Sequence, residues 1–164
     1  FPTVTGQTVS PPARVTRQIA LTLPLPAESG KGRRIVYSAS QQHLWIVDAS
    51  GAVLRDYPVT GRVDRPGVGN YRVYSMSRAS YNPVAKVSFT HMVRFAHGIT
   101  GAAIGFHSIP RWENGAPLQA DESLGLALGR GCCIRQTVPN AKFLYRWASA
   151  IVSGALSRMG RSGK

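Results

Sequence analysis

The sequence predicts a mainly β domain with a single helix near its C-terminus, and three observations support this. Short runs rich in β-branched and aromatic residues follow one another between residues 34 and 107. The 17 glycines and 11 prolines imply many turns and short elements. Only residues 137–152 show a clear helical periodicity in their apolar positions.

The strands are expected in the first two thirds of the chain. The sequence Asp-Ala-Ser-Gly at 48–51 has turn chemistry and predicts a hairpin. In 86–97 apolar and polar residues alternate, with Val87, His91 and Phe95 on the apolar face. The predicted strands are RIVYSAS (34–40), HLWIVD (43–48), AVLRDYPV (52–59), NYRVYSMS (70–77), KVSFTHMVRFAH (86–97) and GAAIGFH (101–107).

The predicted helix covers residues 137–152. Phe143, Trp147 and Ile151 are four residues apart and form an apolar stripe, which indicates a helix packed on the sheets. Thr137 is suited to cap the N-terminus of this helix. The picture from the residues alone is a pair of sheets with one helix beside them.

The ends of the chain differ in composition from its middle. Residues 1–33 are rich in proline and are expected to form an extended arm or linker, or a segment packed along the domain surface. Residues 34–154 are expected to form one domain, and the basic tail 155–164 is expected to fray. The chain starts with neither an initiator Met nor a signal peptide, which suggests a trimmed or matured protein.

The charge of the chain is strongly basic, with 20 Lys and Arg against 7 Asp and Glu and a net charge of +13. Such a surface is expected to attract polyanions. Nucleic acid, an anionic membrane and the acidic polymers of a bacterial wall all remain open as partners, because net charge does not distinguish them. No segment has the apolar length of a membrane span.

Both cysteines of the chain, Cys132 and Cys133, lie in the basic, glycine-rich stretch 129–136 directly before the predicted helix. Backbone N–H groups, the helix N-terminus and the flanking Arg130 and Arg135 favour a thiolate there, and the thiolate is the reactive form. Structural, metal-binding, redox and nucleophilic roles are open. Zinc is disfavoured, because adjacent cysteines rarely provide two tetrahedral ligands and no CxxC or HExxH spacing is present.

A nucleophilic cysteine needs a base, and four histidines are available. His107 is the best candidate because it ends an apolar strand, where a side chain can reach a cleft. His91 is expected to be a core or sheet residue, His97 a turn residue, and His43 a residue of an early strand.

Several blocks of the sequence resemble, in order, the L,D-transpeptidase catalytic domain of the YkuD type. IGFHSIP (104–110), GCCIRQ (131–136) and NAKFLYRWA (140–148) resemble the family's histidine strand, cysteine turn and helix. Upstream blocks from residue 34 onward resemble its opening hairpin and the strands before the histidine. The resemblance covers about residues 33–150 and implies a YkuD-like β-sandwich of mixed sheets, with the C-terminal helix packed beside the active-site turn.

The resemblance implies a site residue by residue. The nucleophile is Cys133, which precedes Ile-Arg as in the family, and His107 is its acid/base partner. The carbonyl of Ser108 orients the imidazole. The N–H groups of Gly131, Cys132 and Cys133 form the oxyanion hole. Arg135 either binds a substrate carboxylate or ties the turn to a neighbouring carbonyl.

The resemblance also implies a reaction and a setting. The cysteine takes an acyl group from a peptidoglycan stem peptide, releases D-Ala and passes the acyl group to an amine, or to water as an L,D-carboxypeptidase. Such a protein takes part in cell-wall biogenesis and cell shape, is exported to the periplasm or cell wall, and acts as a monomer without a metal or cofactor. Peptidoglycan stems and anionic wall polymers are its expected partners, and nucleic acid is not.

Two departures from the family pattern bear on activity. Arg130 stands where the family has Ser, and Cys132 stands where it has the Gly before the nucleophile. A cysteine is strained where a glycine takes a positive φ, and two adjacent thiols offer a vicinal disulfide that would silence the enzyme. A wall-binding domain without turnover, or less plausibly a nucleic-acid-binding module, is therefore the alternative. The long stretch 111–129 is expected to be a lid or a surface loop.

Overall fold

The computed structural model describes residues 23–127, 131, 133–152 and 158–161, and most of these lie in strands. The elements are β1 (Arg34–Ser38), β2 (His43–Val47), β3 (Val53–Pro58), β4 (Asn70–Arg72), β5 (Ser75–Asn82), β6 (Val87–His97), β7 (Ala103–Ser108), β8 (Arg111–Trp112), the 3-10 helix η2 (Asp121–Ser123), β9 (Ile134–Gln136), α2 (Val138–Val152) and β10 (Arg158–Arg161).

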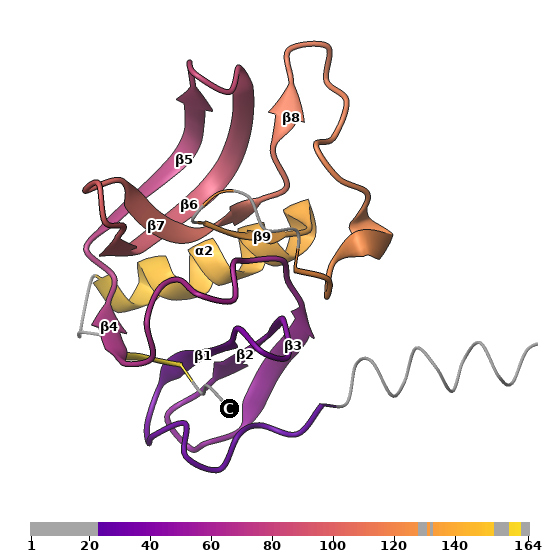
Figure 1. Cartoon of the computed structure of the whole chain (residues 1–164). Coiled ribbons are helices and arrows are strands. Elements are labelled where there is room, and N and C mark those ends of the chain that lie inside the picture. Colours follow the sequence, from indigo (N-terminus) through magenta and orange to yellow (C-terminus); the bar gives the residue numbers. More distant parts are fainter. Residues whose placement is uncertain (1–22, 128–130, 132, 153–157, 162–164) are drawn as a thin grey trace, which may run out of the picture.

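The strands form two mixed sheets. One sheet has the order β3-β2-β1-β10-β4, and the other has the order β5-β6-β7-β9, with β8 paired to β6. Both contain one parallel pair, β1 with β10 and β7 with β9. The helix α2 runs between the two sheets (Figure 1). The predicted β-sandwich of mixed sheets with a C-terminal helix is thus confirmed.

The first sheet is buried on both faces at β1 and β2, because each face is covered by a different layer. The inner face joins the main core. On the outer face Leu23 and Leu25 pack against Trp45 and its neighbours, and the indole Nε1 of Trp45 donates to the Leu23 carbonyl at 2.9 Å. Residues 1–33 were expected to be an extended arm or a segment packed along the domain surface. At Leu23 and Leu25 the packed alternative is observed, and residues 1–22 lie outside the described residues.

The single strand expected over 70–77 is two strands in different sheets. β4 pairs with β10 in the first sheet, and β5 pairs with β6 in the second. The chain crosses between sheets at Val73 and Tyr74, which the continuous apolar pattern does not reveal. The prediction of one strand here was wrong.

β6 does not keep the simple alternation that its sequence suggests. His91 has a left-handed backbone with φ of 56°, and the pairing of β6 with β7 shifts register between Arg94 and Ala96. As a result Met92 and Ala96, from the face expected to be polar, are buried as well. His97 is the last residue of β6 rather than a turn residue, and its ring stacks on Tyr74 at 4.7 Å.

The helix α2 has the predicted cap, and of the predicted apolar stripe Trp147 is buried and Phe143 half-buried, while the side chain of Ile151 is not described. The backbone N–H of Asn140 donates to the Thr137 hydroxyl at 3.3 Å, which satisfies one of the otherwise unpaired N–H groups of the first turn. Leu144, Trp147 and Ala148 are buried in the core shared with both sheets. The helix thereby fixes the position of β9, which leads directly into it.

The C-terminal tail was expected to fray, and for its described residues this was wrong. Arg158–Arg161 form β10, which pairs in parallel with β1 and antiparallel with β4. The strand fills the gap between those two and completes the first sheet. Its backbone hydrogen bonds, rather than any strong hydrophobic run in the sequence, account for its position.

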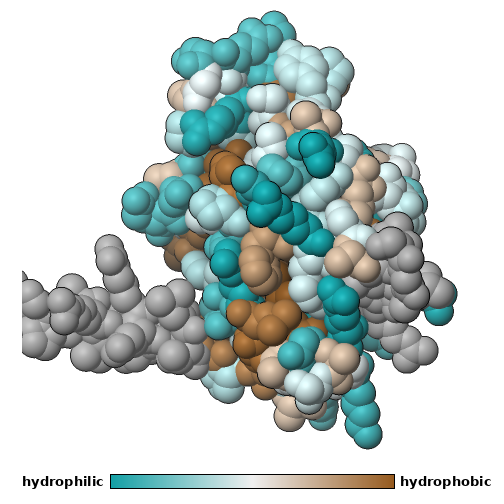
Figure 2. Space-filling view, turned by 180° about the vertical axis from the view of Figure 1, so that it is seen from behind, coloured by the Kyte–Doolittle hydropathy of each residue, from teal (hydrophilic) through white to brown (hydrophobic). Residues whose placement is uncertain are grey.

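On the face seen from behind, hydrophobic and polar residues occupy different parts of the surface. Figure 2 shows hydrophobic residues gathered in the lower half, at the level of β1–β3 in Figure 1, and a mostly polar surface above. Within the described part of the chain, no helix has the length and apolar character needed to span a membrane.

Candidate active site

The parallel pairing of β7 with β9 brings the predicted histidine and cysteine segments together. Phe106 pairs with Ile134, His107 with Arg135, and Ser108 with Gln136. Because paired residues share a face of a sheet, His107 and Arg135 project to the same side. Cys133 directly precedes β9, and its thiol donates to the carbonyl of Ala103, the first residue of β7, at 3.5 Å.

The imidazole of His107 is fixed in one orientation. Its Nδ1 lies 2.6 Å from the carbonyl oxygen of Ser108. A carbonyl oxygen only accepts hydrogen bonds, so Nδ1 carries the proton and Nε2 keeps its lone pair. The ring also stacks on Phe89, with centroids 4.1 Å apart. This hydrogen bond and stacking leave the neutral imidazole with Nε2 as its proton acceptor.

The environment of His107 disfavours its charged form. Only 4% of the residue is exposed, and this burial is the main cause that lowers its pKa to about 4. The hydrogen bond to the Ser108 carbonyl works against this shift, whereas the nearby cations Arg135 and Arg94 add to it. At neutral pH His107 is therefore neutral and able to accept a proton.

Ser108 holds the end of β7 through its side chain as well as its carbonyl. Its hydroxyl oxygen accepts the backbone N–H of Thr90 at 2.9 Å and lies 3.2 Å from the Thr90 hydroxyl. Because these contacts hold Ser108 of β7 against Thr90 of β6, the Ser108 carbonyl has a defined position next to the His107 ring. Sequence reasoning considered only the carbonyl and missed this contact.

Gly105 lets β7 approach β6 closely, two residues before His107. A Cβ at this position would collide with the backbone carbonyl of Val93 on β6. The collision would be with backbone rather than with a flexible side chain, so the strand itself would have to move. The glycine is therefore needed for the spacing of the strand that carries the histidine.

Arg135 is tied to the segment that links His107 to the cysteines. Its Nη1 donates to the side-chain oxygen of Gln119 at 2.9 Å, and its backbone exchanges hydrogen bonds with Thr60 at 2.7 and 3.0 Å. Burial lowers the pKa of the guanidinium, and its interaction with Cys133 opposes that shift. The contact with Gln119 resembles the structural role predicted for Arg135, although the acceptor is a side-chain amide. Binding of a substrate carboxylate by Arg135 stays a prediction.

The turn before β9 is described only in part. Gly131 has a positive φ of 78°, and a Cβ there would lie 3.7 Å from Nη2 of Arg135. Cys132 lies outside the described residues, so the predictions of strain, of an oxyanion-hole N–H and of a vicinal disulfide at this position stay predictions. In the described part of the turn, the residue with a left-handed backbone is Gly131, and glycine adopts this conformation without strain.

The long segment between the histidine and the cysteines is anchored at several points. Leu118 donates its N–H to the Pro110 carbonyl, and Gly125 donates to the Val59 carbonyl after β3. The hydroxyl of Thr60 donates to the carbonyl of Leu126, and the amide of Gln119 reaches the same hydroxyl at 3.3 Å. Neither Gln119 nor Thr60 has a sequence signal that would have predicted its place beside Arg135.

Of the other histidines, His97 pairs with Ala103 at the start of β7, whereas His43 and His91 have other partners. His43 is buried in β2 and pairs with Asp56 at 2.7 Å, as expected for a residue of an early strand. His91 is half-buried on β6, beside α2. Among the described residues, no three His, Cys, Asp or Glu side chains come together in a way that could hold a metal ion.

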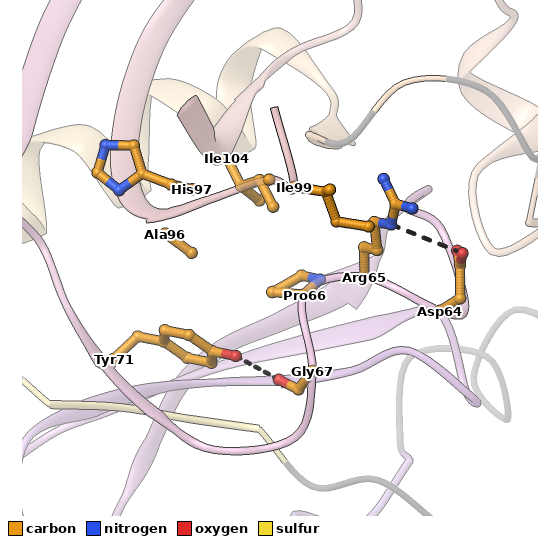
Figure 3. A pocket seen from close by; sticks show the side chains of 10 residues that line it. Asp64, Arg65, Pro66, Gly67, Tyr71, Ala96, His97, Ile99 and Ile104 are labelled. Carbon is orange, nitrogen blue, oxygen red and sulfur yellow. Dashed lines mark hydrogen bonds and ion pairs between the residues drawn. The ribbon is translucent and has the colours of Figure 1, made fainter. Parts of the chain in front are cut away.

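A cavity of about 510 Å³ opens beside the start of β7 (Figure 3). One wall is the segment 64–67 together with Tyr71, and the other is the end of β6 and the turn that follows it. Two of its lining residues are next to Ala103. His97 pairs with Ala103 across the strands, and Ile104 follows it in the sequence. The Ala103 carbonyl also accepts the Cys133 thiol, although neither Cys133 nor His107 lines the cavity.

Comparison with solved structures identifies the fold. Three matches are an L,D-transpeptidase in complex with imipenem (TM-score 0.57, 20% identity), L,D-transpeptidase 3 from Mycobacterium tuberculosis with a faropenem-derived adduct (0.56, 19%) and an L,D-transpeptidase from Stackebrandtia nassauensis (0.55, 18%). The chain has the L,D-transpeptidase fold. The matches cover 81%, 81% and 84% of this chain. Neither the family models nor the curated proteins give a match.

The L,D-transpeptidase fold accounts for the order of elements around the candidate site, in which the histidine strand, the cysteine turn and the helix follow one another. The chain spans only about three fifths of the solved L,D-transpeptidase structures, namely 60%, 61% and 58% of the three chains. At this level of identity the likeness establishes the fold, and the chemistry must be argued from the residues.

Proposed function

We propose that the chain is a cysteine acyltransferase of the L,D-transpeptidase type, with residues 34–154 as its catalytic domain. The observation that carries this proposal is the fixed tautomer of His107, whose Nδ1 is held by the Ser108 carbonyl at 2.6 Å. The strand that holds it pairs in parallel with β9, which begins directly after Cys133. Cysteine acyl transfer needs a base with an unprotonated acceptor nitrogen that can reach the thiol, and this pairing of strands brings the two segments together.

In the first half-reaction the Cys133 thiol exchanges the Ala103 carbonyl for Nε2 of His107 as its proton acceptor. The sulfur then attacks the carbonyl carbon of the stem-peptide bond that ends in D-Ala. The C–S bond forms, and the C–N bond breaks as His107 returns the proton to the departing amine. The product is a thioester on Cys133, and D-Ala leaves as the neutral amine.

In the second half-reaction an amine from another stem peptide attacks the thioester. His107 takes a proton from this amine, the new C–N bond forms, and the sulfur leaves as the thiolate that His107 reprotonates. If water attacks instead, the product is a shortened stem with a free carboxylate. The N–H groups of Gly131, Cys132 and Cys133 are the proposed donors to the oxyanion in both steps.

The charges around the site support the anionic intermediates. Arg135 interacts electrostatically with Cys133, and a neighbouring cation favours the thiolate over the thiol. The same guanidinium and that of Arg94 disfavour the imidazolium of His107. At neutral pH the proposed base is therefore a neutral imidazole, and the Arg135 guanidinium stabilises negative charge on the sulfur.

The substrate and setting follow from the same proposal. The cavity beside Ala103 offers space for part of a peptidoglycan stem, with Arg65 and His97 among its lining residues. The proposed protein acts as an exported monomer on the cell wall without a cofactor. Its net charge of +13 suits an anionic surrounding.

Intact-mass spectrometry after incubation with imipenem tests the proposal. We expect one covalent adduct, because the β-lactam carbonyl acylates an activated thiol and the thioester is resolved slowly. The adduct should vanish in Cys133→Ala and remain in Cys132→Ala. In His107→Gln the rate of its formation should fall by about 10²-fold or more.

Two results would contradict this proposal. An adduct that survives in Cys133→Ala but not in Cys132→Ala would show that Cys132, and not Cys133, is the nucleophile. A folded wild-type protein that binds purified peptidoglycan but forms no adduct, after reduction with dithiothreitol to exclude a vicinal disulfide, would indicate a wall-binding domain without turnover.

A further inference from the structure

Four basic side chains from three elements lie close enough to one another to interact electrostatically. They are Arg78 on β5, His91 on β6, and Lys142 and Arg146 on α2. Lys142, Arg78 and Arg146 all act electrostatically on His91 and, after burial, contribute to lowering its pKa. We call these four residues the basic cluster.

The backbone places these side chains next to one another. Arg78 lies between Ser77 and Ala79, whose partners Met92 and Thr90 flank His91, so Arg78 faces His91 across the hairpin. The His91 ring meets the Tyr145 ring edge to face, with centroids 5.4 Å apart.

The two helix cations lie on the same helix as Tyr145. Lys142 and Arg146 are one helical turn apart and flank Tyr145 in the sequence. Both are exposed, as is Arg78, so the three long side chains are open to solvent around the half-buried His91.

Among the described residues, no ion pair joins a carboxylate to the basic cluster. The sequence contains no Asp or Glu in residues 65–112 or 123–164, which include β4–β7, β9 and α2. Acidic residues elsewhere have other partners: Asp56 pairs with His43, Asp64 with Arg62, and Glu113 with Tyr81. Like charges four residues apart on a helix, such as Lys142 and Arg146, destabilise it slightly. An anion from outside the chain would relieve this repulsion.

Two features hold the His91 ring in place. Its backbone is left-handed with φ of 56°, a region in which histidine is enriched, and its Nδ1 lies 3.0 Å from the Thr90 hydroxyl. These constraints keep the ring between β5 and α2 rather than in solvent.

We infer that the basic cluster is a binding surface for a linear polyanion with phosphodiester groups joined by aliphatic spacers. Its charges come from three elements on an open surface, which suits a chain with repeated charges better than a small enclosed ion. Guanidinium groups form paired hydrogen bonds with phosphate oxygens. That this polymer belongs to the cell wall rests on the proposed function.

Two other polyanions fit the cluster less well. Single-stranded nucleic acid is held by exposed aromatic rings on which bases stack, whereas Tyr145 is half-buried and engaged edge-on with His91. A membrane-surface helix inserts an exposed apolar face, whereas the apolar face of α2 is buried in the core at Leu144, Trp147 and Ala148.

Binding to this surface is coupled to a proton on His91. The groups that face the ring are the Thr90 hydroxyl from β6, Arg78 from β5, and Lys142, Tyr145 and Arg146 from α2. A bound phosphate neutralises these cations and favours the imidazolium, so affinity increases as the pH falls.

The probe is a fluorescently labelled synthetic poly(glycerol phosphate) oligomer, and its binding to the whole chain is followed by anisotropy. In the triple variant Arg78→Gln, Lys142→Gln, Arg146→Gln we expect affinity to fall at least about tenfold, and the slope of log K against log salt to decrease by about 2. The matched control Lys31→Gln, Arg72→Gln, Arg111→Gln removes the same charge from exposed positions elsewhere and should lose less than about threefold. Equal losses in the two triple variants would overturn the inference.

Separate variants test the coupling between polymer binding and protonation of His91. His91→Asn tolerates the left-handed backbone, and it should remove the gain in affinity between about pH 7.5 and 5.5, whereas His97→Asn should keep it. A gain that persists in His91→Asn would contradict the assigned coupling. Tighter binding of length-matched single-stranded DNA, or of phosphatidylglycerol vesicles, would overturn the choice of polymer.

The outcome is separable from that of the acyltransferase proposal. Cys133→Ala should bind the oligomer as the wild type does, and the triple variant should form the imipenem adduct at the wild-type rate. Circular dichroism melting curves of every variant show that it is folded. Loss of the adduct alone therefore counts against the enzyme, and loss of the cluster-dependent binding alone counts against this surface.

Discussion

The Nδ1 atom of His107 lies 2.6 Å from the carbonyl oxygen of the next residue, Ser108. This short contact within one strand fixes the tautomer of the proposed base without help from any carboxylate. It also has a thermodynamic consequence, since the ring is buried while neutral. Protonation of His107 would place an uncompensated charge among Phe89, Arg94 and Arg135.

The first prediction concerns acid stability. Burial lowers the pKa of folded His107 to about 4, below the unfolded value near 6.5. The unfolded chain therefore binds this proton first, so the stabilisation is complete above about pH 6.5 and is lost as the pH falls toward 4. Between pH 7.5 and 5 His107 should account for a loss on the order of 2 kcal/mol in the free energy of unfolding, measured by urea denaturation.

The His107→Gln variant isolates this contribution, because it lacks the titrating ring. Its free energy of unfolding should depend less on pH than that of the wild type, by the amount given above. His97→Gln, altered at an exposed position, should keep the wild-type dependence. Identical pH profiles for His107→Gln and the wild type would show that the imidazole is not buried in the neutral form.

The second prediction separates the effect of the Arg135 charge on Cys133 from the effect of the hydrogen bond between Arg135 and Gln119. If its charge favours the Cys133 thiolate, Arg135→Gln should slow alkylation of the thiol by iodoacetamide at neutral pH about tenfold, measured in a Cys132→Ala background. Gln119→Ala, which leaves the charge but removes the 2.9 Å hydrogen bond, should slow it no more than about threefold. Similar rates for Arg135→Gln and its parent would mean that the guanidinium does not act on the sulfur.

The sequence predicts the parts of this site that depend on local pattern. The strand ending at His107, the helix with Thr137 as its cap and the hairpin around Asp48 all follow from periodicity and turn chemistry. The order of the blocks predicts the fold. These features are encoded in neighbouring residues, so a single sequence is sufficient to find them.

Long-range contacts lie beyond such reasoning. Gln119 and Thr60 come to Arg135 from distant segments, and neither has a distinctive spacing. The crossing between sheets at Val73 follows from packing against β10, a strand with no strong apolar run of its own. The left-handed backbone at His91 is likewise a product of tertiary structure, since propensity would not place it in a strand.

The third prediction tests the close approach of β7 to β6. Gly105→Ala introduces a Cβ that collides with the Val93 carbonyl, so the strand carrying His107 must shift. We expect a loss of about 2–4 kcal/mol in the free energy of unfolding and slower imipenem acylation. Gly67→Ala is the matched control, because its Cβ would meet only the Tyr71 hydroxyl at 3.9 Å, and it should be nearly neutral. If Gly105→Ala is equally neutral, the two strands are not as close as the structure has them.

The last prediction contrasts a buried hydrogen bond with an exposed ion pair. His43 has a side chain only 2% exposed and lies 2.7 Å from the Asp56 carboxylate, while burial lowers its pKa and the carboxylate partly offsets this. Asp56→Ala leaves a buried imidazole N–H without its acceptor, which should cost about 1–3 kcal/mol. Asp64→Ala breaks the Arg62 pair, whose carboxylate is 52% exposed, and should cost clearly less than Asp56→Ala because water replaces the lost partner. Urea denaturation of both variants at neutral pH gives the comparison, and an equal cost for the two would mean that water reaches His43 as readily as it reaches Arg62.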